Sequence, residues 1–241
     1  MSEEEKKDEK TAEQQAAAEP AAKKKKKKWP VVVGIVVVVI AVAGIGFWNW
    51  HATPGFCNSM CHESMDAYVE TYDNVAGQAG VDKYGNAVSN SSAMMVVAHK
   101  EANVACLDCH VPSITQQLGE VMETITGNYY VVNRNDGKGF ALEEVDQEAL
   151  MVNSGHAEGT GDQFCLKSGC HDMTRADLTA ATANMERNPH SWQHGEEACT
   201  TCHKSHRASV LYCTQCHSDA VDELPDGWVT YEQGKKLVPT E

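Results

Sequence analysis

The sequence predicts a mainly α-helical domain with long loops, preceded by a single N-terminal transmembrane helix. Three observations support this fold class. Residues 31–47 are an unbroken run of apolar and glycine residues, and all ten cysteines fall into five pairs that are each followed directly by histidine. Short helical patterns and stretches rich in glycine, asparagine and serine lie between the pairs. Loop-forming stretches between short helical patterns favour short helices joined by loops over extended sheets.

The N-terminal region predicts a membrane anchor. Residues 29–50 are long enough to cross a hydrocarbon core of roughly 30 Å as a helix, and tryptophans stand at both ends of the run. Six consecutive lysines, residues 23–28, precede it. Because such basic segments stay in the cytoplasm, we expect a single-pass protein of the cell membrane with a cytoplasmic N-terminus and an extracytoplasmic domain. The alternative is a cleaved signal peptide, which the long charged leader disfavours.

The net charge of the chain changes sign near the start of the predicted anchor. The whole chain carries −14, residues 1–30 carry +2, and the remainder therefore carries −16. Residues 1–28 contain no aromatic residue, so we expect them to form a disordered cytoplasmic tail. An outer domain this acidic repels a phosphate backbone, which excludes nucleic acid as a partner.

The five cysteine pairs match the attachment motif of c-type haem. In C-x-x-C-H, the two thiols bind the haem covalently and the histidine ligates the iron. The first pair has three intervening residues and the third has four, whereas the others have two. Zinc sites and disulfides are the alternatives, but neither requires a histidine after each second cysteine. The predicted attachment residues are Cys57, Cys61 and His62; Cys106, Cys109 and His110; Cys165, Cys170 and His171; Cys199, Cys202 and His203; and Cys213, Cys216 and His217.

These motifs predict one pentahaem cytochrome c domain over residues 51–223, packed around its covalently bound haems, with residues 224–241 as a polar C-terminal tail. Within the domain, residues 63–73, 141–152 and 174–186 have helical patterns. The last of these opens with a capping pattern, since Thr174 is followed three residues later by Asp177. Residues 74–98 are rich in glycine, asparagine and serine and are predicted to be loop.

Six histidines remain for the second axial positions. Electron-transfer haems usually carry histidine or methionine there. The predicted distal ligands of haems two to five are His99, His190, His194 and His206, with His156 a weaker candidate and His51 interfacial. The first haem then lacks a distal histidine, and Met65, three residues beyond His62, is the candidate ligand. The alternative for Met65 is packing in the protein interior.

The motifs resemble a known family. A single anchor, FCNSMCHESM at 56–65, His99 and CLDCHVP at 106–112 resemble the NapC/NirT/NrfH group of membrane-anchored multihaem cytochromes. This resemblance implies oxidation of menaquinol and transfer of the electrons to an extracytoplasmic reductase in anaerobic respiration. It also places Glu120 and Glu123 near the quinol site, where a carboxylate is suited to accept a proton. The alternative is that each is an ordinary solvated glutamate.

The C-terminal motifs, residues 188–217, also resemble the cytochrome part of flavocytochrome c fumarate reductases. A flavin- or molybdenum-dependent reductase is therefore the expected kind of acceptor. The favoured hypothesis is an electron-transfer protein with quinol dehydrogenase activity, and its alternative is an anchored relay fed by another membrane complex. A multihaem reductase in its own right needs an open iron position, which the supply of histidines disfavours.

Overall fold

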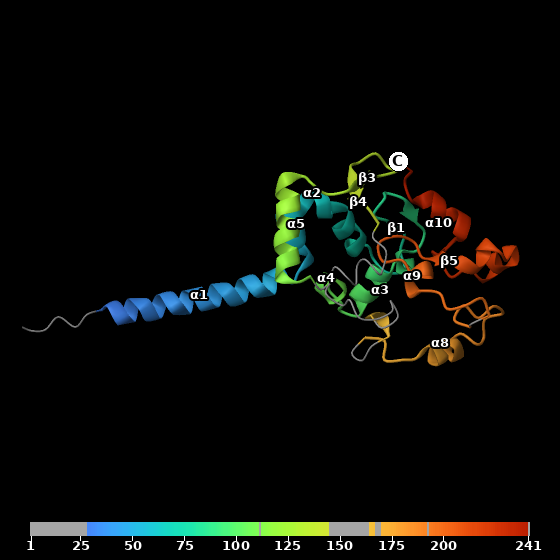
Figure 1. Cartoon of the computed structure of the whole chain (residues 1–241), viewed down its shortest axis with the longest axis horizontal. Coiled ribbons are helices and arrows are strands. Elements are labelled where there is room, and N and C mark those ends of the chain that lie inside the picture. Colours follow the sequence, from blue (N-terminus) through green and yellow to red (C-terminus); the bar gives the residue numbers. More distant parts are fainter. Residues whose placement is uncertain (1–27, 111, 145–163, 167–169, 192, 241) are drawn as a thin grey trace, which may run out of the picture. The chain divides into compact units, whose positions relative to one another are not determined.

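The computed structural model describes residues 28–110, 112–144, 164–166, 170–191 and 193–240 (Figure 1). The chain divides into two units, residues 1–46 and residues 47–241. The second unit is mainly helical with long connecting loops, and its strands form only two-stranded pairs. The predicted fold class is therefore confirmed.

Helix α1, Trp29–His51, is the one described helix that is long and apolar enough to cross a membrane. Its 23 residues extend about 35 Å at 1.5 Å per residue. None of its residues is buried. A helix that is apolar on every side and covered by none of the protein is suited to lipid.

Helix α2, Pro54–Asp73, begins three residues later and carries the first cysteine pair. Proline at its first position suits a helix start, since no hydrogen bond is lost there. The helix is kinked at Cys61, where φ is −130° and ψ is 38°. The rings of Phe47 and Trp50 meet that of Phe56 at 5.8 and 5.0 Å between centroids. The helix predicted over residues 63–73 is thus the second half of a longer one.

The segment predicted as loop contains three short elements and the start of a fourth. Strands β1, Gly80–Val81, and β2, Ala87–Val88, form an antiparallel hairpin. They are followed by the 3₁₀ turn η1, Ser91–Ala93, and helix α3, Met95–Glu101. Helix α3 exists because its apolar side covers a small core, whose buried members are Val88, Ala93, Met94, Val97 and Ala208.

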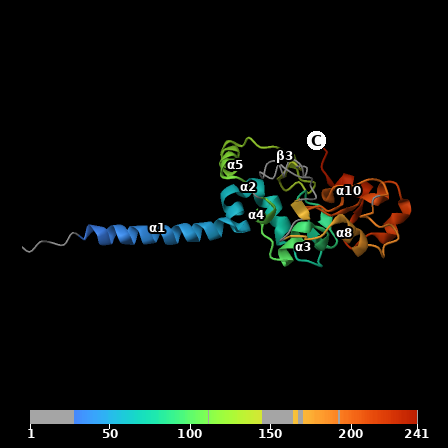
Figure 2. The ribbon, with the colours of Figure 1, turned by 60° about the horizontal axis from the view of Figure 1, so that its bottom comes forward.

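Helix α5, Ile114–Thr126, has both of its ends capped. Ser113 and Gln116 exchange side-chain to backbone hydrogen bonds at the start, and Gly127 ends the helix with a φ of 67°. Strands β3, Val131–Asn133, and β4, Phe140–Leu142, then form an antiparallel pair. In both views α5 lies beside α2 (Figures 1 and 2), and Thr124 of α5 contacts Cys61 of α2.

The segment 141–152, predicted to be a helix, begins as a strand in the structure. Its first two residues belong to β4, because Leu142 pairs with Val131 across the ladder, and residues 145–152 lie outside the described residues. Helix α8, Arg175–Ala181, agrees better with its prediction. Thr174 and Asp177 form the expected capping box, although the helix ends five residues before residue 186.

Residues 224–241, expected to be a polar tail, contribute a strand and a helix to the domain. Strand β5, Val210–Leu211, pairs in parallel with β6, Val229–Thr230. Between them lie the 3₁₀ segments η2, Tyr212–Gln215, and η3, Ser218–Glu223. Helix α10, Tyr231–Leu237, follows β6, and its buried Gly234 contacts Val210 so closely that an added Cβ would lie 2.6 Å from a Val210 methyl carbon.

Candidate functional site

The attachment motifs share one local geometry. In four of them the backbone N–H of the motif histidine donates to the carbonyl of the first cysteine, over 2.8 to 3.2 Å. In the second and fourth motifs this bond closes the single-turn helices α4, Cys106–Cys109, and α9, Cys199–Cys202. A single helical turn brings both cysteines and the histidine to one side, as covalent attachment of one planar group requires. The donors are His110, His171, His203 and His217.

The alternative uses of the cysteines find no support in this geometry. All ten cysteines lie in the described residues and all are free of disulfides. Within the described part of the chain, no three histidine, cysteine or acidic side chains converge as a zinc site would need.

Four predicted distal histidines each lie opposite a motif histidine. The ring centroids are separated by 6.4 Å for His110 and His206, 5.9 Å for His99 and His171, 6.4 Å for His190 and His203, and 5.9 Å for His194 and His217. Metal–imidazole bonds are about 2 Å long, so two imidazoles on opposite sides of one metal ion have ring centres roughly 6 Å apart. The residues present therefore fit four iron sites with two histidines each.

Hydrogen bonds on the second ring nitrogen support this fit for three of the distal histidines. His206 Nδ1 lies 2.7 Å from Thr71 Oγ1, and that hydroxyl donates its own hydrogen to the Tyr68 carbonyl. Nδ1 must therefore donate, which leaves Nε2 with a free lone pair for a metal. Ligating histidines are commonly oriented in this way.

His99 and His190 follow the same rule. His99 Nδ1 lies 2.8 Å from the Met95 carbonyl, which can only accept. His190 Nδ1 lies 3.1 Å from Thr182 Oγ1, a hydroxyl with two acceptors of its own at Leu178 and Asn188. The sequence analysis missed these orienting groups. The only local signal was the spacing of Met95 four residues before His99, because Thr71 and His206 are 135 residues apart.

The pKa values agree with neutral imidazoles at these positions. Burial, followed by the proximity of His110 and Lys83, lowers the pKa of His206 to about 3. Burial also lowers the pKa of His110, of His203 and of His190. Metal binding requires the neutral ring, so burial prepares these side chains for ligation.

The first motif differs from the others. His62 is exposed, and none of the four histidine pairs found among the described residues includes it. Met65, half-buried one turn further along α2, is in the second half of the kinked helix. The weaker candidate His156 lies outside the described residues, and His51 packs against Phe56 at 4.7 Å between ring centroids.

A cationic cluster surrounds His206. Arg207 Nε and Nη2 bond Glu144 at 2.9 and 3.2 Å, Lys204 Nζ lies 4.0 Å from the same carboxylate, and the backbone N–H of Lys83 donates to the His206 carbonyl. Even with Asp82 nearby, the three cations exceed the two carboxylates by one charge. The cluster is electropositive in an acidic domain, and none of its residues was singled out from the sequence.

One atom of this cluster has no partner. Arg207 Nη1 is buried and, among the described residues, forms no hydrogen bond. A buried donor left unpaired costs about 1–3 kcal/mol. Haem carries propionate carboxylates, and a carboxylate is the acceptor that a guanidinium fits best. After the histidine pairs, the unpaired Arg207 Nη1 is therefore a second observation that is consistent with bound haem.

The predicted quinol-site residues lie on α5. Thr124 Oγ1 approaches Cys61 Sγ at 3.8 Å, which fixes α5 against the first cysteine pair. Glu120 is near enough to contribute to the raised pKa of the Cys57 thiol, after burial and Cys61. Partial burial, followed by the charge of Glu123, raises the pKa of Glu120 itself. The structure therefore brings Glu120 beside the first motif, with Glu123 close to Glu120.

Neighbouring motifs are close enough to act on one another. Cys57 contributes, after burial, to the raised pKa of Cys106, which reaches about 11. Cys213 likewise contributes to the raised pKa of Cys202, after burial. His203 is influenced by His190, His171 and His99. The first motif is thus adjacent to the second, and the fourth motif to the fifth. The pair His99–His171 is likewise adjacent to the pair His190–His203.

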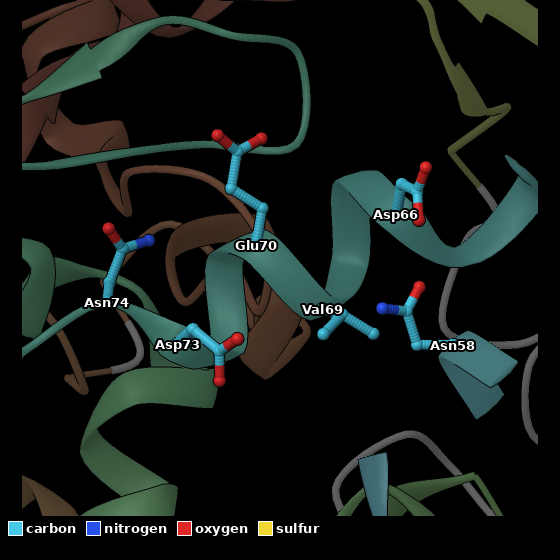
Figure 3. A pocket seen from close by; sticks show the side chains of 6 residues that line it. All are labelled: Asn58, Asp66, Val69, Glu70, Asp73 and Asn74. Carbon is cyan, nitrogen blue, oxygen red and sulfur yellow. The ribbon is translucent and has the colours of Figure 1, made fainter. Parts of the chain in front are cut away.

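A hollow along α2 has the opposite polarity (Figure 3). Its lining residues are Asn58, Asp66, Val69, Glu70, Asp73 and Asn74. Of the three acidic side chains, Glu70 is paired with Arg134 at 2.6 Å. Because this hollow is electronegative, it is unsuited to a cofactor that carries carboxylates.

Comparison with known proteins was consistent with this geometry. The family model described as Cytochrome c3 matches residues 142–218. Cytochrome c-type protein Cgr1 of Eggerthella lenta is 50% identical over 199 residues, which cover 82% of this chain and 85% of that protein. Probable fumarate reductase Ifc3 of Shewanella frigidimarina is 32% identical over 59 residues, 20% of this chain and 10% of that protein. No solved structure matches the chain.

Proposed function

We propose that this chain, which belongs to the family of cytochrome c-type proteins that includes Cgr1 of Eggerthella lenta, oxidises menaquinol at the membrane surface and passes the electrons to an extracytoplasmic reductase. Its general role as a c-type electron-transfer protein follows from the family and from the Cytochrome c3 match. The proposal adds the donor, the acceptor, the membrane orientation and a set of five haems.

We assign the iron ligands as pairs. His110 with His206, His99 with His171, His190 with His203 and His194 with His217 would hold haems two to five, and His62 with Met65 would hold the first. Arg207 and Lys83 would bind a propionate of the haem between His110 and His206. Haem iron, when bound, supplies one-electron redox centres.

The observation that carries quinol oxidation is the position of Glu120. Oxidation of a quinol to a quinone releases two electrons and two protons, so a proton acceptor is needed beside the electron acceptor. Glu120 lies next to the first motif, and its raised pKa makes it a better base than an ordinary glutamate. Helix α1 ends only six residues before Cys57, so this motif is near the source of a lipid-soluble donor.

Glu120→Gln tests the role of this carboxylate. In stopped-flow reduction of the oxidised protein by a menaquinol analogue, we expect this variant to be slowed at least about tenfold, as removal of a general base predicts. Glu123→Gln tests the other candidate acceptor; because it also removes a charge that raises the pKa of Glu120, it should shift the pH dependence and leave the Glu120 carboxylate in place. Reduction of the wild-type protein should be sensitive to a quinone-site inhibitor.

The pH dependence gives a second readout. The carboxylate form accepts the proton, so the wild-type rate should fall as pH drops through the raised pKa of Glu120. Glu120→Gln should lose this limb of the profile. Haems that dithionite reduces but quinol does not would contradict quinol oxidation and favour the relay fed by another membrane complex.

A further inference from the structure

Helix α5 exposes its apolar side. Five of its side chains are between 39% and 78% exposed, namely Ile114, Leu118, Val121, Met122 and Ile125. At about 100° per residue, they form one stripe roughly 100° wide. We call these five residues the α5 stripe. Scattered apolar residues are normal on a protein surface, but a contiguous row along one helix indicates a binding surface.

A polar flank of the same helix faces the protein. Gln116, Gln117 and Thr124 are less exposed than the stripe, and Thr124 contacts Cys61. The helix is therefore inverted relative to a helix of a water-soluble domain, which buries its apolar side. Both acids of α5, Glu120 and Glu123, also lie on the side away from the stripe.

The cofactor of the first motif does not explain this exposure. Thr124 marks the side of α5 that faces the attachment cysteines. The centre of the α5 stripe is roughly 100° further around the helix, so most of the stripe does not face Cys61. Among the described residues, nothing covers the stripe.

The path of the chain identifies the partner of the stripe as lipid. Helix α1 ends at His51 and α2 begins at Pro54. Cys61, against which α5 packs, is therefore at most about 20 Å along the chain from the end of the membrane-spanning helix. Shortly after the helix in the chain, Tyr130 is 84% exposed and the apolar Val131 is also exposed. Tyrosine is enriched at the level of the lipid headgroups.

We propose that α5 is an interfacial helix whose stripe inserts among the lipids beside the transmembrane helix. This inference rests on the membrane anchoring in the proposed function and goes beyond it, because it fixes which face of the domain meets the bilayer. Helix α5 contains no lysine or arginine. Insertion must therefore depend on burial of apolar surface and not on anionic headgroups.

Nitroxide labels on the full-length holoprotein test this proposal. The haem cysteines are blocked by their thioether bonds, so Ile125→Cys supplies a single reactive thiol in the α5 stripe. Val221→Cys, at an exposed apolar position in η3, is the matched control, and Ile40→Cys in α1 is the reference for lipid. Each variant is labelled, checked for full haem content and reconstituted in nanodiscs of phosphatidylcholine alone.

Collision rates with oxygen and with a water-soluble nickel chelate report the surroundings of each label. We expect the oxygen-to-nickel ratio at position 125 to be several-fold above that at 221 and to approach that at 40. The ratio should not change when anionic lipid is added. The α5 stripe is water-exposed, and the inference overturned, if position 125 resembles 221 while 40 remains lipid-like.

Two further outcomes would also contradict the inference, and each has a different meaning. A label at 125 that neither reagent reaches would indicate a protein partner or a second copy on the stripe. Water-like values at both 40 and 125 would remove the membrane anchor itself, and with it the basis of the proposed function.

Discussion

The Thr71 hydroxyl accepts a hydrogen bond from His206, over 2.7 Å, while donating its own hydrogen to the Tyr68 carbonyl. This arrangement fixes the ring of His206 with Nε2 toward His110. It also makes the ring a more basic ligand, because an acceptor on Nδ1–H increases electron density on the imidazole. A basic ligand favours the oxidised iron.

Thr71→Val removes that acceptor with little change of volume. We expect the midpoint potential of one haem to rise, by up to roughly 40 mV, if the lost hydrogen bond is worth about 1 kcal/mol and 59 mV corresponds to 1.4 kcal/mol for one electron. Optical redox titration measures the shift. Thr71→Ser keeps the hydroxyl and should restore the wild-type potential, whereas equal titrations for Val and wild type would show that Thr71 does not act on a ligand.

The cationic cluster predicts a shift in the opposite direction. Lys83 contacts the rings of Tyr68 and Tyr84 through its ammonium group, at 5.3 and 4.8 Å from the ring centroids, and lies beside His206. A cation disfavours the oxidised, more positive iron, so Lys83→Met should lower one potential. For an assumed separation of about 10 Å between the Lys83 charge and the haem, and an effective dielectric constant of about 20, the effect is roughly 1.7 kcal/mol, or roughly 70 mV.

The control for this charge is Lys235→Met. Lys235 is an exposed lysine that pairs with Glu232 at 3.6 Å on the surface, and exposed charges are screened by solvent and salt. Its removal should leave every potential unchanged. If both variants shift the titration equally, the effect is that of net charge and not of a propionate-binding cluster.

Met65→His tests the assigned ligand of the first haem. Methionine raises the potential of a haem relative to histidine, so this substitution should lower one wave by roughly 100 mV or more, within the range set by axial ligands. Met60→His, in the attachment loop and exposed, is the matched control and should change nothing. An unmoved wave in Met65→His would exclude Met65 as a ligand.

The long apolar helix α1 and the capping box at Thr174 were predictable because each is encoded within consecutive residues. The pairing of histidines was not. His206 follows the fourth motif along the chain but lies opposite His110 of the second, and His99 precedes the second motif but lies opposite His171 of the third. Only tertiary contacts decide such pairs, and sequence spacing carries no information about them.

Helix α10 shows the same limit at the level of secondary structure. Gly234 in its centre lowers helix propensity, and the segment was predicted to be a tail. The local signal was Thr230 with Gln233, which form a capping box in the structure. What stabilises the helix beyond this cap is packing of its glycine on Val210, a residue 24 positions earlier in the chain.

That contact supplies a stability test with a matched pair of glycines. Gly234→Ala would place a methyl group 2.6 Å from a Val210 side-chain carbon. Overpacking of this kind costs about 1–3 kcal/mol, more than the gain of about 1 kcal/mol that alanine brings to a helix. We therefore expect a lower free energy of unfolding for the holoprotein. Gly119→Ala in α5 has nothing within 4 Å of the added carbon and should be neutral or stabilising. A stabilised Gly234→Ala variant would show that α10 does not pack on β5 in solution.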